Sequence, residues 1–520
     1  MLTSANNDAY TIVLEWLDQN VHLRYSSHTI MAKQPSTLRL NLPAPAKGVP
    51  LYRWLYEELR AAILAGRLPP GARLPATRDL AEQYGLSRPT IVSAFEQLRL
   101  EGYVEGKVGS GTYVSKTLPD TLLHAPQARA AKRARAKKPH FSEYARRLPV
   151  FVEAGFRPLR AFRARYPALD EFPTGLWAQV AARRLRRASV QLLSGGEALG
   201  YRPLRQAVAE YLNTSRGVKC AAEQVLIISG VQQALDRASR LLLNPGDPVW
   251  MEEPGYPGAA RAFAAIGARI CPVPVDSQGL NLEAGMRRWD RPRLVYVTPA
   301  HQFPLGMTMS LSRRLALLAW AQRSGAVIFE DDYDSEYRYA GRPIPALQGL
   351  DTAGVVIFAG SFSDVLFPGL RLAYIVVPPA MVDRFAAAES VSTHPSPLVD
   401  QAILSDFIRE GHFARHVRRM RELYAERLEA LLDCARKELA GVLTIPPIEA
   451  GLRTVAWLQP QMSAEKAALL AEKRQIDVLP LSRYAWGKSK PNGLVLGFAA
   501  VGTKEIRRGV QGLAEALTPG

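Results

Sequence analysis

The chain has 520 residues and a formal net charge of +18, with 66 lysines and arginines against 48 aspartates and glutamates. A hydrophobic fraction of 48% and a charged fraction of 22% exclude wholesale disorder, and the length exceeds that of a single core, so about two to four domains are expected. The basic balance, with a pI near 9.9, indicates a polyanionic partner, although an arginine-rich proteome would give the same charge.

Cysteine usage and hydropathy indicate the compartment. The three cysteines are odd in number, far apart and without metal-ligand spacing, which predicts reduced thiols and no metal site. No apolar run reaches membrane-spanning length, and acidic residues interrupt the N-terminal stretch where a signal peptide would have its apolar core. We therefore expect a cytoplasmic protein without a membrane partner.

Residues 1–48 form an N-terminal extension to which no structure is assigned. Its few apolar residues could form one short amphipathic helix, but Met31 serves as well as Met1 for a translation start. The status of this extension is therefore left open.

Residues 49–116 predict three helices and a hairpin. The first helix ends before Gly66, and its expected apolar face consists of Tyr52, Leu55, Tyr56, Leu59, Ala62 and Ile63. The second follows Thr77, with Leu80, Ala81 and Tyr84 inward. Ser87 is placed to cap the third, whose stripe is Ile91, Ala94, Phe95 and Leu98.

Two short strand-like pieces follow the third helix, at residues 103–104 and 113–114, around Gly109-Ser110-Gly111. Three helices and a hairpin in this order predict a winged helix-turn-helix of α+β class. Residues 117–150 are a basic linker, most simply a solvated tether, although its arginines and lysines would also suit non-specific contact with the DNA backbone.

Residues 151–520 alternate β-branched apolar runs with helical stretches. Such runs between helices indicate buried, mostly parallel strands in an α/β domain, and they occur at residues 225–228, 294–297, 326–329, 355–358 and 374–377. A long helical stretch, roughly 400 to 440, precedes runs around Val455 and Leu494 that predict a small C-terminal α+β lobe.

The first folded segment resembles the GntR-type winged helix over about seventy residues, through Leu74-Pro75-Ala76-Thr77-Arg78-Asp79-Leu80-Ala81 and Gly85-Leu86-Ser87-Arg88-Pro89-Thr90-Ile91. The resemblance implies that the third helix enters the major groove of double-stranded DNA. The DNA-binding residues it implies are Arg78, Ser87, Arg88, Thr90, Lys107 and Gly109. The alternative is a protein-binding winged helix on which these arginines are surface charges.

The remainder resembles the aminotransferase-like domain of MocR-type regulators, a fold-type I domain of enzymes that use pyridoxal phosphate (PLP). The resemblance is carried by Gly200-Tyr201-Arg202-Pro203-Leu204-Arg205, Glu253-Pro254-Gly255-Tyr256-Pro257-Gly258, Thr298-Pro299-Ala300-His301-Gln302-Phe303-Pro304-Leu305-Gly306 and Glu330-Asp331-Asp332-Tyr333-Asp334-Ser335-Glu336. It implies a homodimer, arranged head-to-tail, with a pocket at each interface.

The resemblance also implies a role for each pocket residue. Backbone amides of Ser229, Gly230 and Val231 suit a phosphate at a helix start. Ser361 and Arg371 complete this phosphate cup. Asp331 bonds the pyridine nitrogen, Tyr333 faces the ring hydroxyl, and Tyr256 stacks on the ring. Alternatively, these residues persist as scaffold around an empty or repurposed pocket.

Asp364 departs from the family pattern. It lies in Ser361-Phe362-Ser363-Asp364-Val365-Leu366-Phe367-Pro368-Gly369-Leu370-Arg371, where the pattern places the lysine that forms the Schiff base with PLP. No lysine occurs between Lys219 and Lys437. Arg453 and Arg483 are the remaining candidates to hold a ligand carboxylate.

We therefore expect a DNA-binding transcriptional regulator rather than an enzyme, with no catalytic residue. Its aminotransferase-like domain is expected to dimerise and to sense a small-molecule effector, with PLP or pyridoxamine phosphate bound non-covalently if at all. Two alternatives stay open: a ligand-independent regulator that uses this domain only for dimerisation, and an active PLP-dependent transaminase. The operator, the regulated genes, the sign of regulation and the effector do not follow from the sequence.

Overall fold

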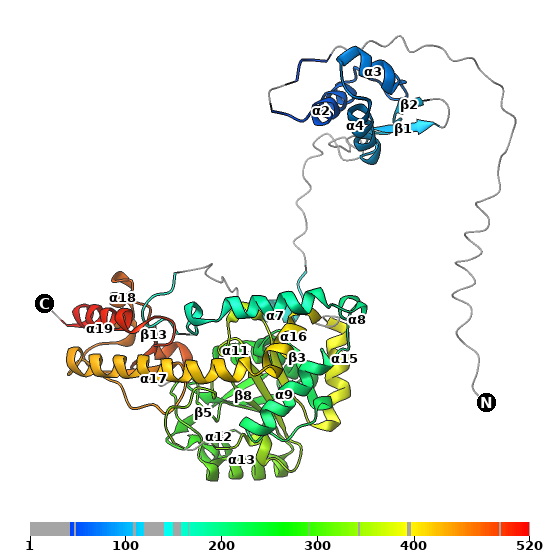
Figure 1. Ribbon diagram of the computed structural model, residues 1–520. Coiled ribbons are helices and arrows are strands. Elements are labelled where there is room, and N and C mark those ends of the chain that lie inside the picture. The colour runs from blue at the N-terminus through cyan, green and yellow to red at the C-terminus, as the bar shows by residue number, and fades with distance from the viewer. Residues whose placement is uncertain are drawn as a thin grey trace, which may run out of the picture. The chain divides into compact units, whose positions relative to one another are not determined.

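The computed structural model describes residues 42–45, 48–107, 111–118, 140–148, 158–164, 166–289, 291–341, 344–392, 397–487 and 490–518. The chain divides into a unit at residues 1–138 and a larger unit at residues 139–520, and each is described by itself (Figure 1). The expected limits at residues 48, 116 and 150 stay predictions. Most of the extension and of the linker lies outside the described residues.

The described part of the smaller unit holds three helices and an antiparallel hairpin around one core. Its elements are α2 Leu51–Leu64, α3 Thr77–Tyr84, α4 Arg88–Leu100, β1 Val104–Lys107 and β2 Gly111–Val114. The predicted winged helix-turn-helix is confirmed. Gly85 ends α3 at a φ of 63°, a left-handed conformation that glycine adopts at little cost, so the chain can turn into α4.

One residue of the predicted core faces solvent. Tyr52 is exposed, whereas Trp54 is buried and packs edge-on against Tyr84 with ring centroids 6.0 Å apart. The inward face of α2 is therefore rotated slightly from the predicted stripe. The predicted stripe of α4 is buried in full.

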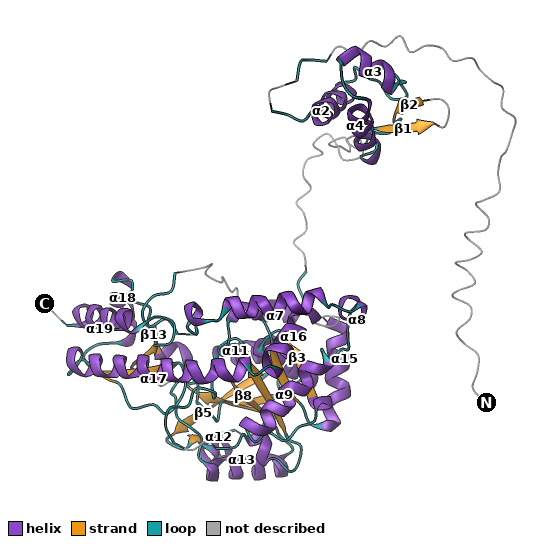
Figure 2. Cartoon of the chain, viewed as in Figure 1, coloured by secondary structure: helices purple, strands orange, loops and turns teal. Residues whose placement is uncertain are grey.

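The larger unit is built on a central sheet, and Figure 2 shows its strands in orange among purple helices. The sheet has eight strands in the order β3-β10-β9-β8-β7-β4-β5-β6. Strands β5, β4, β7, β8 and β9 are parallel to one another, whereas β6 is antiparallel to β5, and β10 is antiparallel to both β9 and β3. The mostly parallel sheet is confirmed, although β4, β5 and β6 were not predicted. The strands are β3 Val225–Ile228, β4 Pro248–Glu253, β5 Arg269–Asp276, β6 Gly279–Leu280, β7 Leu294–Val297, β8 Val327–Asp332, β9 Val356–Ser361 and β10 Ala373–Val376.

Both faces of this sheet are buried, as continuous apolar strands require. Along β7, Leu294 and Tyr296 pack in one cluster with residues of α10 and α11, whereas Val295 and Val297 pack in another with residues of α13. The helices are α6 Glu143–Arg147, α7 Thr174–Arg186, α8 Val190–Ser194, α9 Arg202–Ser215, α10 Val231–Leu242, α11 Pro257–Ile266, α12 Leu282–Arg288, α13 Leu311–Ser324, α14 Leu347–Leu350, α15 Val382–Ser392, α16 Leu398–Arg409, α17 His412–Glu438, α18 Ala464–Lys473 and α19 Thr503–Leu517.

The C-terminal lobe has a four-stranded antiparallel sheet of order β11-β12-β14-β13, which confirms the predicted α+β lobe. Val455 and Val495, in the two predicted runs, are paired directly. The strands are β11 Leu443–Thr444, β12 Arg453–Leu458, β13 Leu479–Pro480 and β14 Gly493–Gly497. In the described part of the chain, no helix combines the length and apolar character needed to cross a membrane.

Candidate functional site

A cavity of about 610 Å³ lies at the carboxyl edge of the large sheet. Because β3 and β9 are both antiparallel to β10, they run in the same direction, and segments that follow β3, β4, β8 and β9 meet at this edge. Open α/β sheets commonly bind ligands there. The cavity brings together seven of the eight predicted cofactor-binding residues, namely Gly230, Val231, Tyr256, Asp331, Tyr333, Ser361 and Arg371.

Asp331 lines this cavity and has one carboxylate oxygen without a partner among the described residues. The side chain is 4% exposed, and the Tyr296 hydroxyl donates to its Oδ2 at 2.7 Å. Its Oδ1 is buried and has no hydrogen-bond partner among the described residues. Burial raises the pKa of Asp331 to about 7, with the charges of Asp332, Asp364 and Asp334 adding to the shift. A buried acceptor of this kind fits a ligand N–H group.

The start of α10 and Arg371 lie close together in this cavity, at the place where a phosphate cup was predicted. The first-turn amides of a helix have no intrahelical acceptor and favour an anion. Arg371 adopts a left-handed φ of 52°, and its Nη2 lies 3.9 Å from the position that a β-carbon on Gly230 would take. Gly230 itself has a φ of 153°, so a side chain there would be strained.

Ser229 does not lie where it was predicted. It is not among the cavity-lining residues, and its amide donates to Gln233 Oε1 at 2.7 Å. Because one amide cannot serve both partners well, Gly230, Val231, Ser361 and Arg371 stay the candidates for a phosphate cup. Ser363, which also lines the cavity and donates its amide to Ser361 Oγ at 3.1 Å, was not predicted.

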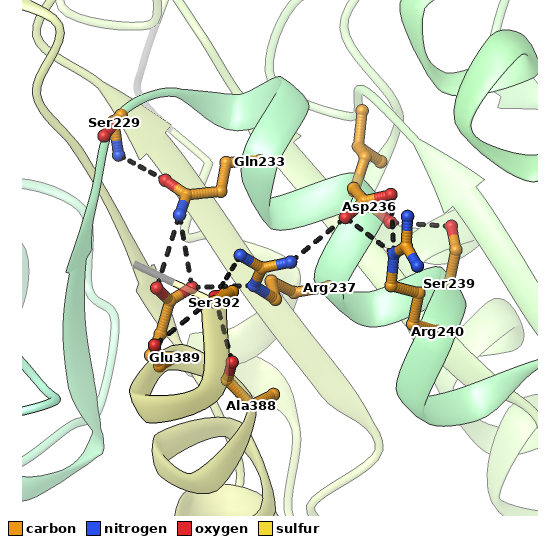
Figure 3. A network of polar contacts seen from close by, with 10 residues as sticks. Ser229, Gln233, Asp236, Arg237, Ser239, Arg240, Ala388, Glu389 and Ser392 are labelled. Atoms are coloured by element: carbon orange, nitrogen blue, oxygen red, sulfur yellow. Dashed lines mark hydrogen bonds and ion pairs between the residues drawn. The ribbon is translucent and has the colours of Figure 1, made fainter. Parts of the chain in front are cut away.

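A buried polar network fixes the first turns of α10 against α15 (Figure 3). Gln233 Nε2 donates to both carboxylate oxygens of Glu389, at 3.4 and 3.3 Å, and Arg237 Nε donates to Glu389 Oε1 at 3.1 Å. Glu389 is 4% exposed. The amide of Ser229 therefore positions the helix start through Gln233, which is a structural role next to the cup.

Tyr256 and Tyr333 line the cavity as predicted, but the Tyr333 hydroxyl already has a partner. It lies 3.0 Å from His301 Nδ1, which is also 2.9 Å from Asp334 Oδ1. Any ligand hydroxyl would have to share Tyr333 with His301. This buried chain of polar groups was not predicted, because its members are separated by some thirty positions in sequence.

Asp364 forms an ion pair with Arg453 across the cavity wall. Arg453 Nη2 lies 3.3 Å from Asp364 Oδ2, and the side chains are 4% and 21% exposed respectively. The guanidinium also lies 5.0 Å from the ring centroids of Phe303 and Tyr333. Its Nε is buried and without a hydrogen-bond partner among the described residues.

The two arginines expected as candidates to hold a ligand carboxylate differ in their position relative to the cavity. Arg453 lines the cavity, whereas Arg483 is exposed and is not among the lining residues. The lining residues of this cavity, all in the described part of the chain, include no lysine. The cavity thus carries a cation and an anion side by side but no side-chain amine for covalent attachment.

The short helix α6 forms part of the same cavity, although its sequence was assigned to the linker. Tyr144 and Leu148 line the cavity, Arg147 Nη1 donates to the Ile266 carbonyl at 3.3 Å, and Arg240 lies 4.6 Å from the Tyr144 ring centroid. The signal for α6 was a helix cap, since Ser142 Oγ accepts from an amide at 3.2 Å in the first turn.

The predicted DNA-binding residues lie around α3, α4 and β1. Arg78 and Arg88 are exposed near the start of their helices. The hydroxyls of Ser87 and Thr90 are hydrogen-bonded to each other at 2.8 Å, and Ser87 Oγ also accepts a hydrogen bond from the Thr90 amide at 3.4 Å. Both side chains therefore serve first to cap α4. Lys107 is exposed over the Tyr113 ring at 5.1 Å, and Gly109 lies outside the described residues.

Two family models match the two units. The gntR family of bacterial regulatory proteins matches residues 51–114, and aminotransferase class I and II matches residues 170–513. The probable rhizopine catabolism regulatory protein MocR of Rhizobium meliloti is 43% identical over 470 residues, covering 90% of this chain and 94% of the relative. The pyridoxine biosynthesis transcriptional regulator PdxR of Corynebacterium glutamicum is 29% identical, covering 90% and 96%.

Among solved structures, the α-aminoadipate aminotransferase LysN of Thermus thermophilus, complexed with N-(5'-phosphopyridoxyl)-L-leucine, matches with a TM-score of 0.66 and 30% identity. The match covers 72% of this chain and 97% of LysN. The order of units, the sheet and the relatives agree with one another. The chain therefore belongs to the MocR-type transcriptional regulators, in which a gntR-family winged helix is fused to an aminotransferase class I and II domain.

Proposed function

We propose that the larger unit senses a pyridoxal-type ligand held without a covalent bond, and that its occupancy alters DNA binding by the winged helix. The regulator would act in the cytoplasm as a homodimer with a head-to-tail arrangement, as the aminotransferase-like fold suggests. When bound, the pyridine ring of such a ligand supplies an electron sink for chemistry at an attached amine. Without a cavity lysine, we expect no transaminase activity.

The observation that carries this proposal is the orphan oxygen of Asp331. A buried acceptor without a partner costs about 1–3 kcal/mol, and a pyridine N–H would remove that cost. The cup around Gly230 and Arg371 gives a ligand phosphate an anion site with a cation and helix amides. Tyr256 lines the same cavity and offers an aromatic ring for stacking.

Asp364 favours pyridoxamine phosphate over PLP in this proposal. Pyridoxamine phosphate carries an ammonium group where PLP carries its aldehyde, and an anion attracts it. Asp364 already pairs with Arg453, but its distance of 3.3 Å is longer than the roughly 2.7–2.9 Å of a strong charge-assisted bond, and a carboxylate accepts more than one donor. We expect the binding free energies of pyridoxamine phosphate and PLP to differ by about 1.5–3 kcal/mol at most.

Calorimetric titration of the full-length protein with both vitamers, in buffer without phosphate, tests the proposal. The wild type should bind pyridoxamine phosphate more tightly than PLP, and Asp364→Asn should narrow the difference. Equal or PLP-favouring affinities would remove the role assigned to Asp364. Binding of neither vitamer would favour the second candidate, a ligand-independent regulator that uses the domain only to dimerise.

A further inference from the structure

A second cavity, of about 450 Å³, lies in the larger unit and shares no lining residue with the first. Its walls come from α9, from residues 335–341 after β8, and from the first turns of α17. The volume falls within the range of about 300–1,000 Å³ that small-molecule sites occupy. No role proposed above for the pyridoxal-type ligand uses this cavity.

Four arginines line it, and they differ in their partners. Two are held by carboxylates: Arg216 lies 2.8 Å from Asp332 Oδ2, and Arg338 lies 2.8 Å from Glu449 Oε2. The other two, Arg418 and Arg421, are exposed on α17.

The charges of these two exposed arginines are not balanced by a paired carboxylate among the described residues. Arg421 donates to the main-chain carbonyl of Glu336, from Nε at 3.0 Å and from Nη2 at 2.8 Å. A carbonyl carries no formal charge, so the guanidinium keeps its full attraction for an anion. The rim of the cavity formed by α17 is therefore positive.

The interior of the cavity holds a hydroxyl without a partner. Ser335 Oγ is buried and has no hydrogen-bond partner among the described residues. Beside it, Glu336 Oε1 accepts from the Tyr211 hydroxyl at 2.8 Å. Phe413 and Val417 add apolar surface from α17. The cavity thus combines two cations at its rim with a hydroxyl that has no partner among the described residues, the carboxyl group of Glu336 and an apolar wall.

We propose that this second cavity binds a small organic oxyanion, a carboxylate or a phosphate compound, between Arg418 and Arg421 with a hydrogen bond from Ser335. It would be a second effector site of the regulator. The two cavities are connected by one short segment, because Tyr333 lines the first and Ser335, two residues later, lines the second. An anion that orders Ser335 therefore acts on the segment that positions Tyr333.

Ala414 gives a sharp test, because it lines the cavity, is exposed and lies in the first turn of α17. Calorimetric titrations of the full-length protein in chloride buffer would use inorganic phosphate and succinate as separate probes. We expect saturable binding of at least one probe, and the probe that binds tells a phosphate compound from a carboxylate. Ala414→Glu should weaken this binding by about tenfold or more, whereas the uncharged Ala414→Gln should change it by about twofold at most.

Three further variants separate this cavity from the first. Arg418→Ala should weaken binding by about tenfold, because a charge-assisted bond is lost. Arg436→Ala, about 27 Å further along the same helix, should leave it unchanged. Arg371→Ala should remove binding of a probe at the phosphate cup of the first cavity and leave binding at the second cavity unchanged. The proposal is overturned if neither probe binds saturably, or if Arg371→Ala abolishes all binding while Ala414→Glu leaves it intact.

Discussion

Asp331 and Asp332 are adjacent carboxylates that are 4% and 7% exposed, yet we predict opposite effects for the same Asp→Asn exchange. Asp332 accepts from Arg216 Nε at 2.8 Å. Removing one partner of such a buried pair costs about 3–5 kcal/mol, so Asp332→Asn should destabilise the larger unit. Oδ1 of both carboxylates has no partner among the described residues, but the Oδ2 of Asp331 accepts from a neutral hydroxyl, that of Tyr296, rather than from a cation.

The magnitude for Asp331 follows from its pKa, which burial raises from 3.8 to about 7. This pKa difference lowers the free energy of unfolding by roughly 4 kcal/mol at pH 8. Because the raised pKa favours the protonated form in the folded state, the stability present below pH 4 is lost as the pH rises to about 7. Asparagine avoids this loss but buries an amide without an acceptor, at about 1–3 kcal/mol. Asp331→Asn should therefore stabilise the protein by about 1–3 kcal/mol at pH 8 and destabilise it by up to about 3 kcal/mol at pH 4.

Scanning calorimetry at both pH values would measure these differences on the transition of the larger unit, since a chain of two units need not unfold in one step. In the same variant, the affinity for pyridoxamine phosphate should fall by about 1.5–3 kcal/mol, because the acceptor for the pyridine N–H is lost. Stabilisation together with weaker binding is the signature of a binding residue. If Asp331→Asn destabilises the protein at pH 8 as Asp332→Asn does, the assignment of Asp331 as an unsatisfied binding group is wrong.

Three other predictions concern the winged helix, the missing lysine and α6. Arg88→Ala should weaken the free energy of binding to the cognate operator by about 1–3 kcal/mol if the side chain reads a base edge. If Arg78→Ala leaves both the affinity for DNA and its salt dependence unchanged, Arg78 does not contact DNA. Asp364→Lys should allow covalent attachment of added PLP that borohydride traps, and failure to trap it would favour the scaffold alternative. Tyr144→Ala should weaken vitamer binding a few-fold in titrations without lowering the thermal transition of the larger unit, whereas an unchanged affinity would place Tyr144 outside the ligand contact.

The winged helix was predictable almost to the residue, because its signals are local. The cap at Ser87, the stop at Gly85 and the stripe of α4 each depend on residues within one or two turns. The prediction failed where a neighbour decided the outcome: Trp54 replaces Tyr52 in the core because Tyr84, on another helix, packs against it. Such a contact leaves no periodic signal in the sequence.

Of the strands of the large sheet, likewise, only those with a local sequence signal were predicted. The run at β7 is apolar throughout and was predicted, whereas β4 ends in Glu252 and Glu253 and was missed. Glu252 is nevertheless buried, because the Thr298 hydroxyl and the Gln302 amide group donate to it. A buried acid with one oxygen held by residues from a distant loop cannot be recognised from strand propensity.

The candidate site was predictable as a set of residue types but not as a set of partners. The motif order indicated which side chains would converge, and seven of the eight do so. It could not reveal that Ser229 donates to Gln233, that Tyr333 meets His301, or that a helix from the assumed linker, α6, lines the cavity. These depend on rotamers and docking, which sequence spacing does not determine.

The pairing of Asp364 with Arg453 changes what the absence of a lysine means for the site. A lysine amine can act both as a cation and, when deprotonated, as a nucleophile, whereas a guanidinium stays protonated and presents only N–H donors. Arg453, buried between Phe303 and Tyr333, therefore keeps a positive charge in the cavity without any capacity for covalent attachment. Asp364 balances that charge, which would otherwise be costly to bury. The cavity thus holds a cation and an anion side by side, and the described residues that line it include no lysine amine.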